Sequence, residues 1–201
     1  MKNNTLDKNY WDKRYHNQQT SWDIGSVSTP LKAYADQLKN KDVALLIPGC
    51  GNAYEAEYLL QNGFTNITLI DIAPAPVEVV KMKLKDFDGK QLQIICGDFF
   101  ELEQKFDLII EQTFFCALEP QLRNAYVKKM HDLLNEGGTL AGLLFNRAFE
   151  GGPPFGGSKK EYHSLFSPCF EIKMLKECIN SIAPRAGSEL FFIFKKKALL
   201  L

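Results

Sequence analysis

Residues 42–60, DVALLIPGCGNAYEAEYLL, form the stretch that decides the fold. Its apolar run at residues 43–47 predicts a strand that is covered on both faces of a parallel sheet, and Pro48 is expected to end that strand. Gly49 and Gly51 let the backbone turn sharply and approach a ligand closely, because neither residue has a Cβ. A helix predicted at residues 53–62 would then point its free amides at that ligand.

Strands and helices alternate along most of the chain. With acids and glycines at the carboxyl ends of the strands, the alternation predicts an open, doubly wound α/β sheet with the first strand at its centre and a ligand at the switch point. A turn at Gly137-Gly138 is expected to lead into the fifth strand. The strands are expected at residues 43–47, 67–70, 92–96, 106–111 and 139–145, and the helices at residues 30–40, 53–62, 74–84, 120–134 and 158–166.

The last part of the chain departs from this alternation. Strands are predicted at residues 170–179 and 190–196, joined by a short link that includes residues 184–189. So short a link forces an antiparallel hairpin. A mostly parallel, seven-stranded sheet closed by one antiparallel strand is the usual Rossmann-like plan of class I S-adenosylmethionine-dependent methyltransferases, whereas a nicotinamide enzyme would not require it.

Length and charge limit the classes of function. The 201 residues are 45% hydrophobic and contain no Pro/Ser-rich linker, which predicts one domain with a substantial core. The 24 basic and 24 acidic residues cancel, so neither a nucleic acid nor a membrane is expected as a partner. Residues 1–12 lack an apolar signal segment, and no stretch approaches the roughly 18 apolar residues of a membrane span. We therefore expect a cytoplasmic protein.

The cysteines do not form the pattern of a disulfide framework or a zinc site. Their number is odd and they form no Cys-x-x-Cys pair, and the three histidines have no ligand spacing with them. We expect no metal and interpret the thiols as buried or incidental. The five cysteines are Cys50, Cys96, Cys116, Cys169 and Cys178.

An acidic residue, Asp71, directly follows the second predicted strand. Asp71 lies 20 residues after Gly51, and in a strand-turn-helix-strand unit that spacing brings its carboxylate beside a ligand on the glycine loop. A carboxylate can accept hydrogen bonds from both ribose hydroxyls of such a ligand. The alternative is that Asp71 caps the helix that starts near Pro74. Asp98 follows the third strand in the same manner.

Two tryptophans near the N-terminus, Trp11 and Trp22, need to be buried. Trp11 can share one side of a helix with Tyr10 and Tyr15. These rings could fix the N-terminus to the core, since aromatic side chains bury large areas. They could also belong to a lid, formed by residues 1–29, that covers a ligand. The residues alone leave both readings open.

Short motifs along almost the whole chain carry a resemblance to a known family. The glycine loop alone is weak evidence, but the Phe-Phe-Cys-Ala block together with the paired tryptophans is much more specific. The motifs are YWDKRY at 10–15, WDIG at 22–25, IPGCG at 47–51, DI at 71–72, GDFF at 97–100, FFCALEP at 114–120, GPPF at 152–155 and SIAPR at 181–185. On these motifs the chain resembles the thiopurine S-methyltransferase family, and within it the halide, thiocyanate and thiol methyltransferase branch.

The resemblance implies that S-adenosylmethionine lies across the glycine loop, with the N-terminal segment folded over it. Gly49 would pack against the methionine part, Asp71 would bind the ribose, and Asp98 with Phe99 would hold the adenine. The cofactor contacts implied in this way are Trp11, Tyr15, Trp22, Gly49, Gly51, Asp71, Asp98, Phe99 and Gln112.

This sequence departs from the branch at two of these places. Tyr15 stands where the branch often has Trp, so a ring is kept but its size differs. Gln112 and Thr113 follow the fourth strand beside the reacting sulfur, where the related plant enzymes look more like Tyr-Val.

The chemistry sets demands on the substrate pocket. Methyl transfer is an in-line displacement at carbon, so the protein must align the reactants and exclude water, without a metal or a covalent intermediate. An anionic nucleophile and a sulfonium lose charge together in the transition state, which a dry pocket favours. The resemblance assigns Arg185 to attract that anion, although it could equally be a surface arginine in a hairpin turn. Tyr162 is the second residue expected to face the substrate.

The sequence therefore predicts a methyltransferase that acts on a small sulfur or halide nucleophile, namely a thiol, hydrosulfide, thiocyanate or iodide. The alternatives are a larger aromatic thiol of the thiopurine kind, a selenium or tellurium species, and a non-catalytic protein that binds S-adenosylmethionine. A nicotinamide oxidoreductase is disfavoured, because Tyr54 replaces the third glycine of the dinucleotide fingerprint and the chain is too short for a separate substrate domain. A monomer or homodimer is expected.

Overall fold

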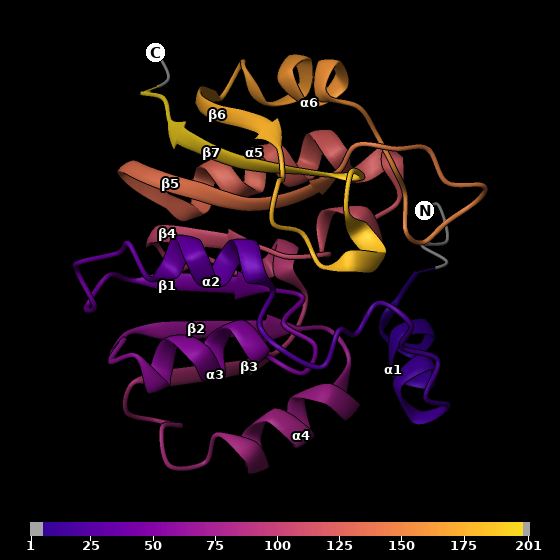
Figure 1. Cartoon of the computed structure of the whole chain (residues 1–201). Coiled ribbons are helices and arrows are strands. Elements are labelled where there is room, and N and C mark those ends of the chain that lie inside the picture. Colours follow the sequence, from indigo (N-terminus) through magenta and orange to yellow (C-terminus); the bar gives the residue numbers. More distant parts are fainter. Residues whose placement is uncertain (1–5, 199–201) are drawn as a thin grey trace.

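A computed structural model describes residues 6–198, and within that range a seven-stranded sheet runs in the order β3-β2-β1-β4-β5-β7-β6 (Figure 1). β1 pairs in parallel with β2 and β4, and β7 pairs antiparallel with both β5 and β6. The predicted fold class is thus confirmed, with the first strand inside the sheet and one antiparallel strand. The strands are β1 (Leu45–Pro48), β2 (Ile67–Asp71), β3 (Leu92–Cys96), β4 (Phe106–Glu111), β5 (Leu134–Phe145), β6 (Phe170–Glu177) and β7 (Glu189–Lys196).

Helices cover both faces of the sheet. On one face, α2, α3 and α4 pack on a core cluster that includes Leu45 and Ile47, and on the other α5 and α6 pack on a cluster that includes Leu46. This alternation follows from the two-residue period of a strand that is buried on both faces. The helices are α1 (Lys8–His16), α2 (Thr29–Ala35), α3 (Tyr54–Gln61), α4 (Pro74–Lys83), α5 (Arg123–Leu133) and α6 (Lys159–Phe166), with short 3₁₀ turns η1 (Phe99–Glu101), η2 (Phe115–Ala117), η3 (Pro120–Leu122) and η4 (Ala183–Arg185).

Pro48 is the last residue of β1 rather than the residue that stops it. It pairs with Ile70 of β2, whereas the pairing of β1 with β4 ends at Leu46. The missing N–H of Pro48 therefore costs no bond in the ladder to β4. The prediction that the strand stops before the proline was wrong by this one residue.

The fifth strand starts earlier than predicted. β5 already pairs at Leu134, and its register to β4 shifts between Phe106 and Leu108. Gly137, with φ of +70°, lies inside this irregular part of the strand. The two glycines thus lie in an irregular part of a long strand instead of in a turn before a short one, and a left-handed glycine is accommodated there as in a G1-type bulge.

The helix predicted at residues 30–40 is shorter. α2 ends at Ala35, and the chain leaves it through hydrogen bonds from Gln37 N to Tyr34 O and from Leu38 N to Ala35 O. These i to i−3 bonds tighten the last turn, as is common where a helix terminates.

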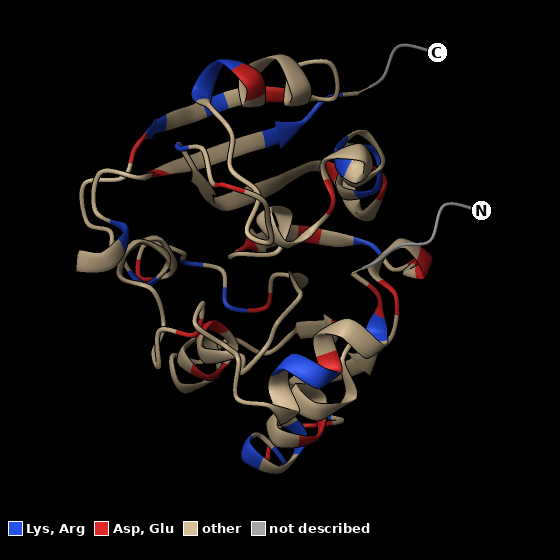
Figure 2. Cartoon of the chain, turned by 90° about the vertical axis from the view of Figure 1, so that its right-hand side faces the viewer, with Lys and Arg blue, Asp and Glu red and all other residues tan. Residues whose placement is uncertain are grey.

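The carboxyl ends of the parallel strands meet at one edge of the sheet, the right-hand side of Figure 1. α1 and the loop after β5 lie at the same edge, and Figure 2 looks onto it. Asp12 of α1 fixes the N-terminal segment there, since its Oδ1 accepts from Ala75 N of α4 at 2.8 Å. It supplies the cap that Ala73, the residue before α4, cannot provide. In the described part of the chain, no helix is both long and apolar enough to cross a membrane.

Candidate active site

A cavity of about 590 Å³ opens at this edge, between the N-terminal segment and the ends of the strands. Its lining divides by position in the sheet. The β1–β3 side is lined from residues 6–100, and the β4–β7 side from residues 112–188. The predicted site residues that line it are Trp11, Tyr15, Trp22, Gly49, Gly51, Asp71, Asp98, Phe99, Gln112 and Arg185.

The glycine loop has no room for side chains. Gly49 and Gly51 both adopt left-handed backbone conformations, with φ of +59° and +49°. A Cβ on Gly49 would lie 2.4 Å from Cδ2 of the Phe114 ring, and one on Gly51 would lie 2.8 Å from the Tyr15 hydroxyl. The close approach expected of a ligand is therefore made, in the protein itself, by two aromatic side chains that pack on the loop.

Asp71 ties this loop to the end of β2. Its Oδ2 accepts from Gly51 N and its Oδ1 from Ala73 N, both at 2.9 Å. Burial raises the pKa of this carboxyl, although the backbone N–H groups around it oppose the rise. Asp71 also lines the cavity. Each carboxylate oxygen can accept more than one hydrogen bond, so these two backbone contacts do not preclude a ligand contact.

The acid after β3 is placed in a similar way. Asp98 accepts from Phe100 N at 2.8 Å, which fixes the turn η1. Phe99 is buried, and its ring meets Phe100 and Phe114 edge to face, with centroids 5.3 and 5.1 Å apart. The cavity wall beyond β3 is thus a rigid aromatic surface beside a carboxylate.

The N-terminal aromatic residues form one cluster over the cavity. The Trp22 ring meets Trp11 and Tyr15 edge to face at 5.6 and 5.8 Å, and the Arg14 guanidinium lies 5.3 Å from the Trp22 centroid. Burial raises the pKa of the Tyr15 hydroxyl, so it stays neutral. Asp23 links the N-terminal segment to the start of α3, because its Oδ2 accepts from the Tyr54 hydroxyl at 3.3 Å. Nine residues of the expected lid, between Leu6 and Ser26, thus line the cavity, whereas residues 1–5 lie outside the described residues.

The turn after β4 rests on a buried acid that the sequence reasoning missed. Glu111 is fully buried, and its Oε1 accepts from Phe114 N at 2.8 Å and Phe115 N at 2.9 Å. Its Oε2 accepts from the Tyr126 hydroxyl at 2.5 Å. Burial raises the pKa of Glu111 to about 7, against the opposing effect of these hydrogen bonds. An acid directly after an apolar strand was the available signal, the same one that pointed to Asp71.

Two residues of this turn face the cavity. Thr113 has a φ of +56°, a strained conformation for a β-branched residue, and such strain is often found at functional sites. The amide oxygen of Gln112 is buried and has no hydrogen-bond partner among the described residues. A buried polar atom without a partner at a cavity wall fits a ligand that donates a hydrogen bond.

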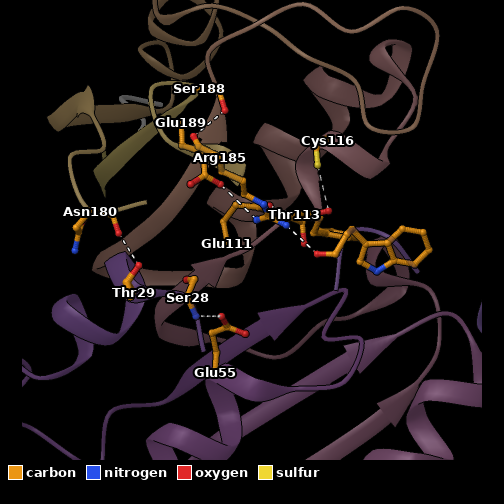
Figure 3. A network of polar contacts seen from close by, with 12 residues as sticks. Ser28, Thr29, Glu55, Glu111, Thr113, Cys116, Asn180, Arg185, Ser188 and Glu189 are labelled. Carbon is orange, nitrogen blue, oxygen red and sulfur yellow. Dashed lines mark hydrogen bonds and ion pairs between the residues drawn. The ribbon is translucent and has the colours of Figure 1, made fainter. Parts of the chain in front are cut away.

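Arg185 is buried rather than solvated. Its Nη1 lies 3.4 Å from Oε1 of the buried Glu189, and its Nη2 donates to the Trp22 carbonyl oxygen at 2.8 Å (Figure 3). Its guanidinium carbon lies 5.6 Å from the Phe145 ring centroid. The surface reading is therefore wrong. Arg185 joins the N-terminal segment to the link before β7, and Glu189 balances part of its charge.

Tyr162 does not face the cavity, and this sequence-based expectation is corrected by the structure. The side chain is buried in the core, where its hydroxyl donates to Phe145 O at 2.7 Å and its ring meets Phe115 edge to face at 5.7 Å. A Cβ on Gly157 would lie 2.3 Å from the same hydroxyl. α6 turns this side chain inward because its apolar face must cover the sheet.

Charge is distributed unevenly around the cavity. The carboxylates that line it, among the described residues, are Asp23, Glu55, Asp71 and Asp98, all on the β1–β3 side. The β4–β7 side presents Arg147 and Arg185 and no lining carboxylate in the described part of the chain. Arg147, which follows β5, was also missed by the sequence reasoning. Opposite fields on the two sides suit two ligands of opposite charge.

Among residues 6–198, the cavity has neither a set of metal ligands nor an ionised thiol. Residues 6–198 contain no group of three or more His, Cys, Asp or Glu side chains that could hold a metal ion. Cys50 and Cys116 line the cavity as free thiols, but burial raises the pKa of both above the usual range. A protonated thiol is a poor nucleophile.

The fold and the site together define a class. A sheet of this order, with a glycine loop after β1 and acids after β2 and β3, is the arrangement of the Rossmann-like, S-adenosylmethionine-dependent methyltransferases. The cavity residues fit that cofactor, since the glycine loop, the Asp71 carboxylate and the unpartnered Gln112 oxygen offer close approach and hydrogen-bond acceptors.

Comparison with known proteins identifies the family. The thiopurine S-methyltransferase family model matches residues 6–198, so the chain belongs to this family. "Probable thiol methyltransferase 2" of Arabidopsis thaliana is 31% identical over 193 residues, covering 94% of this chain and 85% of the relative. "Thiocyanate methyltransferase 1" of Brassica oleracea is 28% identical over 198 residues, covering 96% of this chain and 87% of the relative.

A solved structure shows the same fold. It is the Burkholderia thailandensis 1,6-didemethyltoxoflavin-N1-methyltransferase with bound 1,6-didemethyltoxoflavin and S-adenosylhomocysteine. It aligns with a TM-score of 0.77 at 18% identity, covering 95% of this chain and 87% of that one. The predictions of family, fold class and cofactor are thereby confirmed: the protein is a methyltransferase that depends on S-adenosylmethionine.

Proposed function

We propose that this enzyme transfers the methyl group to a small anionic sulfur or halide nucleophile: a thiolate, hydrosulfide, thiocyanate or iodide. The observation that carries this proposal is the charge on the β4–β7 side of the cavity. Two arginines line it and no carboxylate does so among the described residues. Such a wall attracts an anion and favours the deprotonated form of a thiol.

The β1–β3 side is proposed to hold the cofactor. Gly49, Gly51 and Asp71 would bind its amino acid and ribose parts, and Asp98 with Phe99 would bind the adenine. Gln112 would accept from the ammonium group through its unpartnered oxygen. The cofactor supplies a methyl group on a positively charged sulfur.

The N-terminal aromatic cluster is proposed to dry the reaction site. Trp11, Tyr15 and Trp22 line the cavity, and aromatic faces stabilise a nearby cation by about 0.5–2 kcal/mol. With water excluded, an anionic acceptor is poorly solvated, and the loss of opposite charges in the transition state becomes favourable. Arg185 is proposed to hold the acceptor, although Glu189 shares its charge.

The names of the relatives support this substrate class, because two of them are called thiol and thiocyanate methyltransferases. The family model is named after thiopurines, so a larger aromatic thiol is the second candidate. The cytoplasmic location, the monomeric or homodimeric state and the absence of nucleic acid partners stay predictions.

A panel of acceptors tests the proposal. The purified protein is incubated with S-adenosylmethionine and iodide, thiocyanate, hydrosulfide, small thiols or an aromatic thiol, and S-adenosylhomocysteine release is measured together with volatile products by gas chromatography. Small anionic acceptors are expected to give the highest kcat/KM. The highest value with the aromatic thiol would favour the second candidate, and no release with any acceptor would indicate a non-catalytic binding protein.

A further inference from the structure

Arg147 differs from the other arginines of the cavity, because its charge is unpaired among residues 6–198. The side chain is exposed and its guanidinium carbon lies 4.8 Å from the Phe149 ring centroid. In the described part of the chain no carboxylate lies within ion-pair distance of it. By contrast, Arg185 pairs with Glu189, and Arg14 donates from Nη1 to the Tyr10 hydroxyl at 3.2 Å and lies over aromatic rings.

The backbone of Arg147 is held in place on both sides. The preceding residue, Asn146, donates from its N–H to Ser188 O at 2.8 Å, and Gly157 N donates to Arg147 O at 3.1 Å. Gly156 packs so closely that an added Cβ would lie 1.8 Å from Arg147 O. The arginine is therefore presented from a fixed point at the end of β5, not from a free loop.

These features describe a prepared binding group. A guanidinium offers a planar set of donors that matches a carboxylate through two parallel hydrogen bonds. The guanidinium packs against the Phe149 ring, and both side chains line the cavity. Halide and thiocyanate ions need only one cation, which Arg185 supplies deeper in the protein. A second, unpaired cation on the same side has a use if the acceptor carries a second anionic group.

We propose that Arg147 binds a carboxylate carried by the methyl acceptor, so that the preferred acceptor is a small thiol with a carboxylate close to its sulfur. This inference rests on the proposed function and narrows it. The thiol loses its proton to solvent, its sulfur forms the new bond to the methyl carbon, and the bond between that carbon and the sulfonium breaks. The products are the S-methylated acid and S-adenosylhomocysteine, so charge and atoms balance.

A pair of matched acceptors tests the proposal: mercaptoacetate, which has the carboxylate, and 2-mercaptoethanol, which does not. For Arg147→Met we expect kcat/KM for mercaptoacetate to fall about tenfold or more, since its charge-assisted hydrogen bonds to the carboxylate are lost. The value for 2-mercaptoethanol should fall much less, because this acceptor loses only the general attraction of the positive wall and no hydrogen bonds to a carboxylate. Lys160→Met, an exposed lysine of α6 outside the cavity lining, removes the same charge and should change neither value.

A binding measurement gives a second readout. Calorimetric titration of mercaptoacetate into the protein saturated with S-adenosylhomocysteine should show about tenfold weaker binding to Arg147→Met, with unchanged affinity for S-adenosylhomocysteine itself. Arg147→Lys should recover only part of the loss, because an ammonium cannot bind in the two-pronged manner.

The outcomes separate the two proposals. Turnover of iodide or 2-mercaptoethanol with an equal effect of Arg147→Met on both thiols would overturn the carboxylate site and leave the proposed function standing. Turnover of none of the small acceptors would overturn the proposed function itself. A wild-type enzyme that prefers 2-mercaptoethanol to mercaptoacetate would also contradict the role of Arg147.

Discussion

Glu111 is a single residue on which much of the site depends, since it holds the turn that carries Gln112 and Thr113. Its pKa in the folded protein, about 7, lies above the ordinary value near 4.5 because of burial. The folded state therefore binds this proton more tightly than the unfolded state does. The resulting stability is fully present below about pH 4.5 and is lost as the pH rises through about 7.

We predict that this linkage is visible in the pH dependence of unfolding. Between pH 5 and 8, the free energy of unfolding of the wild type should decrease, and Glu111→Gln should show a smaller decrease because the amide does not titrate. Urea denaturation at both pH values measures the two slopes. Glu103→Gln, a change at an exposed carboxylate, is the control and should behave as the wild type. Parallel slopes for Glu111→Gln and the wild type would show that Glu111 does not carry the linkage.

Asp71 gives a prediction about the cofactor at the same scale. Asp71→Asn keeps one oxygen that can accept from the backbone, but it replaces the second acceptor by a donor and loses the charge that is proposed to hold the ribose hydroxyls. Affinity for S-adenosylhomocysteine should fall about tenfold or more, by the usual strength of charge-assisted hydrogen bonds. Calorimetry measures it, and the exposed Asp88→Asn is the matched control. Unchanged affinity in a folded Asp71→Asn protein would remove the ribose assignment.

At the scale of elements, the glycine loop and the turn after β4 lock together, because the Phe114 ring fills the space beside Gly49. Neither segment can shift without the other. The glycine pattern alone suggested that a ligand lies beside Gly49. The actual neighbour, Phe114, comes from a turn 65 positions further along the chain. A glycine in the sequence shows that the backbone can turn sharply there. It does not show which side chain fills the space where a Cβ would be.

Alanine substitutions at two glycines with left-handed backbone conformations separate the cost of backbone strain from the cost of steric overlap. Gly63→Ala, at φ of +84° with no atom within 4 Å of the added Cβ, should cost about 1 kcal/mol from backbone strain alone. Gly49→Ala should cost about 1–3 kcal/mol more, because its Cβ also overlaps Phe114. Chemical denaturation measures both, and Phe114→Ala should cost less in the Gly49→Ala background than in the wild type, because it removes the overlapping Cγ and Cδ2 atoms. Equal costs at the two glycines would show that the ring moves aside freely.

The N-terminal segment gives an element-scale prediction as well. If it covers the cofactor, S-adenosylhomocysteine should reduce the quenching of Trp11 and Trp22 fluorescence by acrylamide. Trp11→Phe and Trp22→Phe each leave one tryptophan and report the two positions separately. Quenching that S-adenosylhomocysteine leaves unchanged at both positions would contradict the lid.

At the scale of the whole molecule, most of the fold could be predicted from the sequence. Apolar runs and turn residues are local signals, and the short link before β7 left only an antiparallel pairing, so the architecture could be predicted. The site was harder, because its residues meet across the sheet. The direction of Tyr162 depends on which face of α6 packs inward, and the charge of Arg147 is unpaired because no carboxylate from another described segment comes near it. The contact of Arg185 with Trp22 spans 163 residues and leaves no local trace.

The contact between Arg185 and Trp22 joins an early and a late part of the chain, so it can form only near the end of synthesis. Trp22 leaves the ribosome early, whereas Arg185 and Glu189 follow almost at the end. Domains begin to organise while they are made, but contacts between distant residues form late. A nascent chain can thus build the glycine loop and its acids long before it can fasten the N-terminal segment over them. If the N-terminal segment excludes water from the site, as we propose, the newly made protein can do so only when its final hairpin is complete.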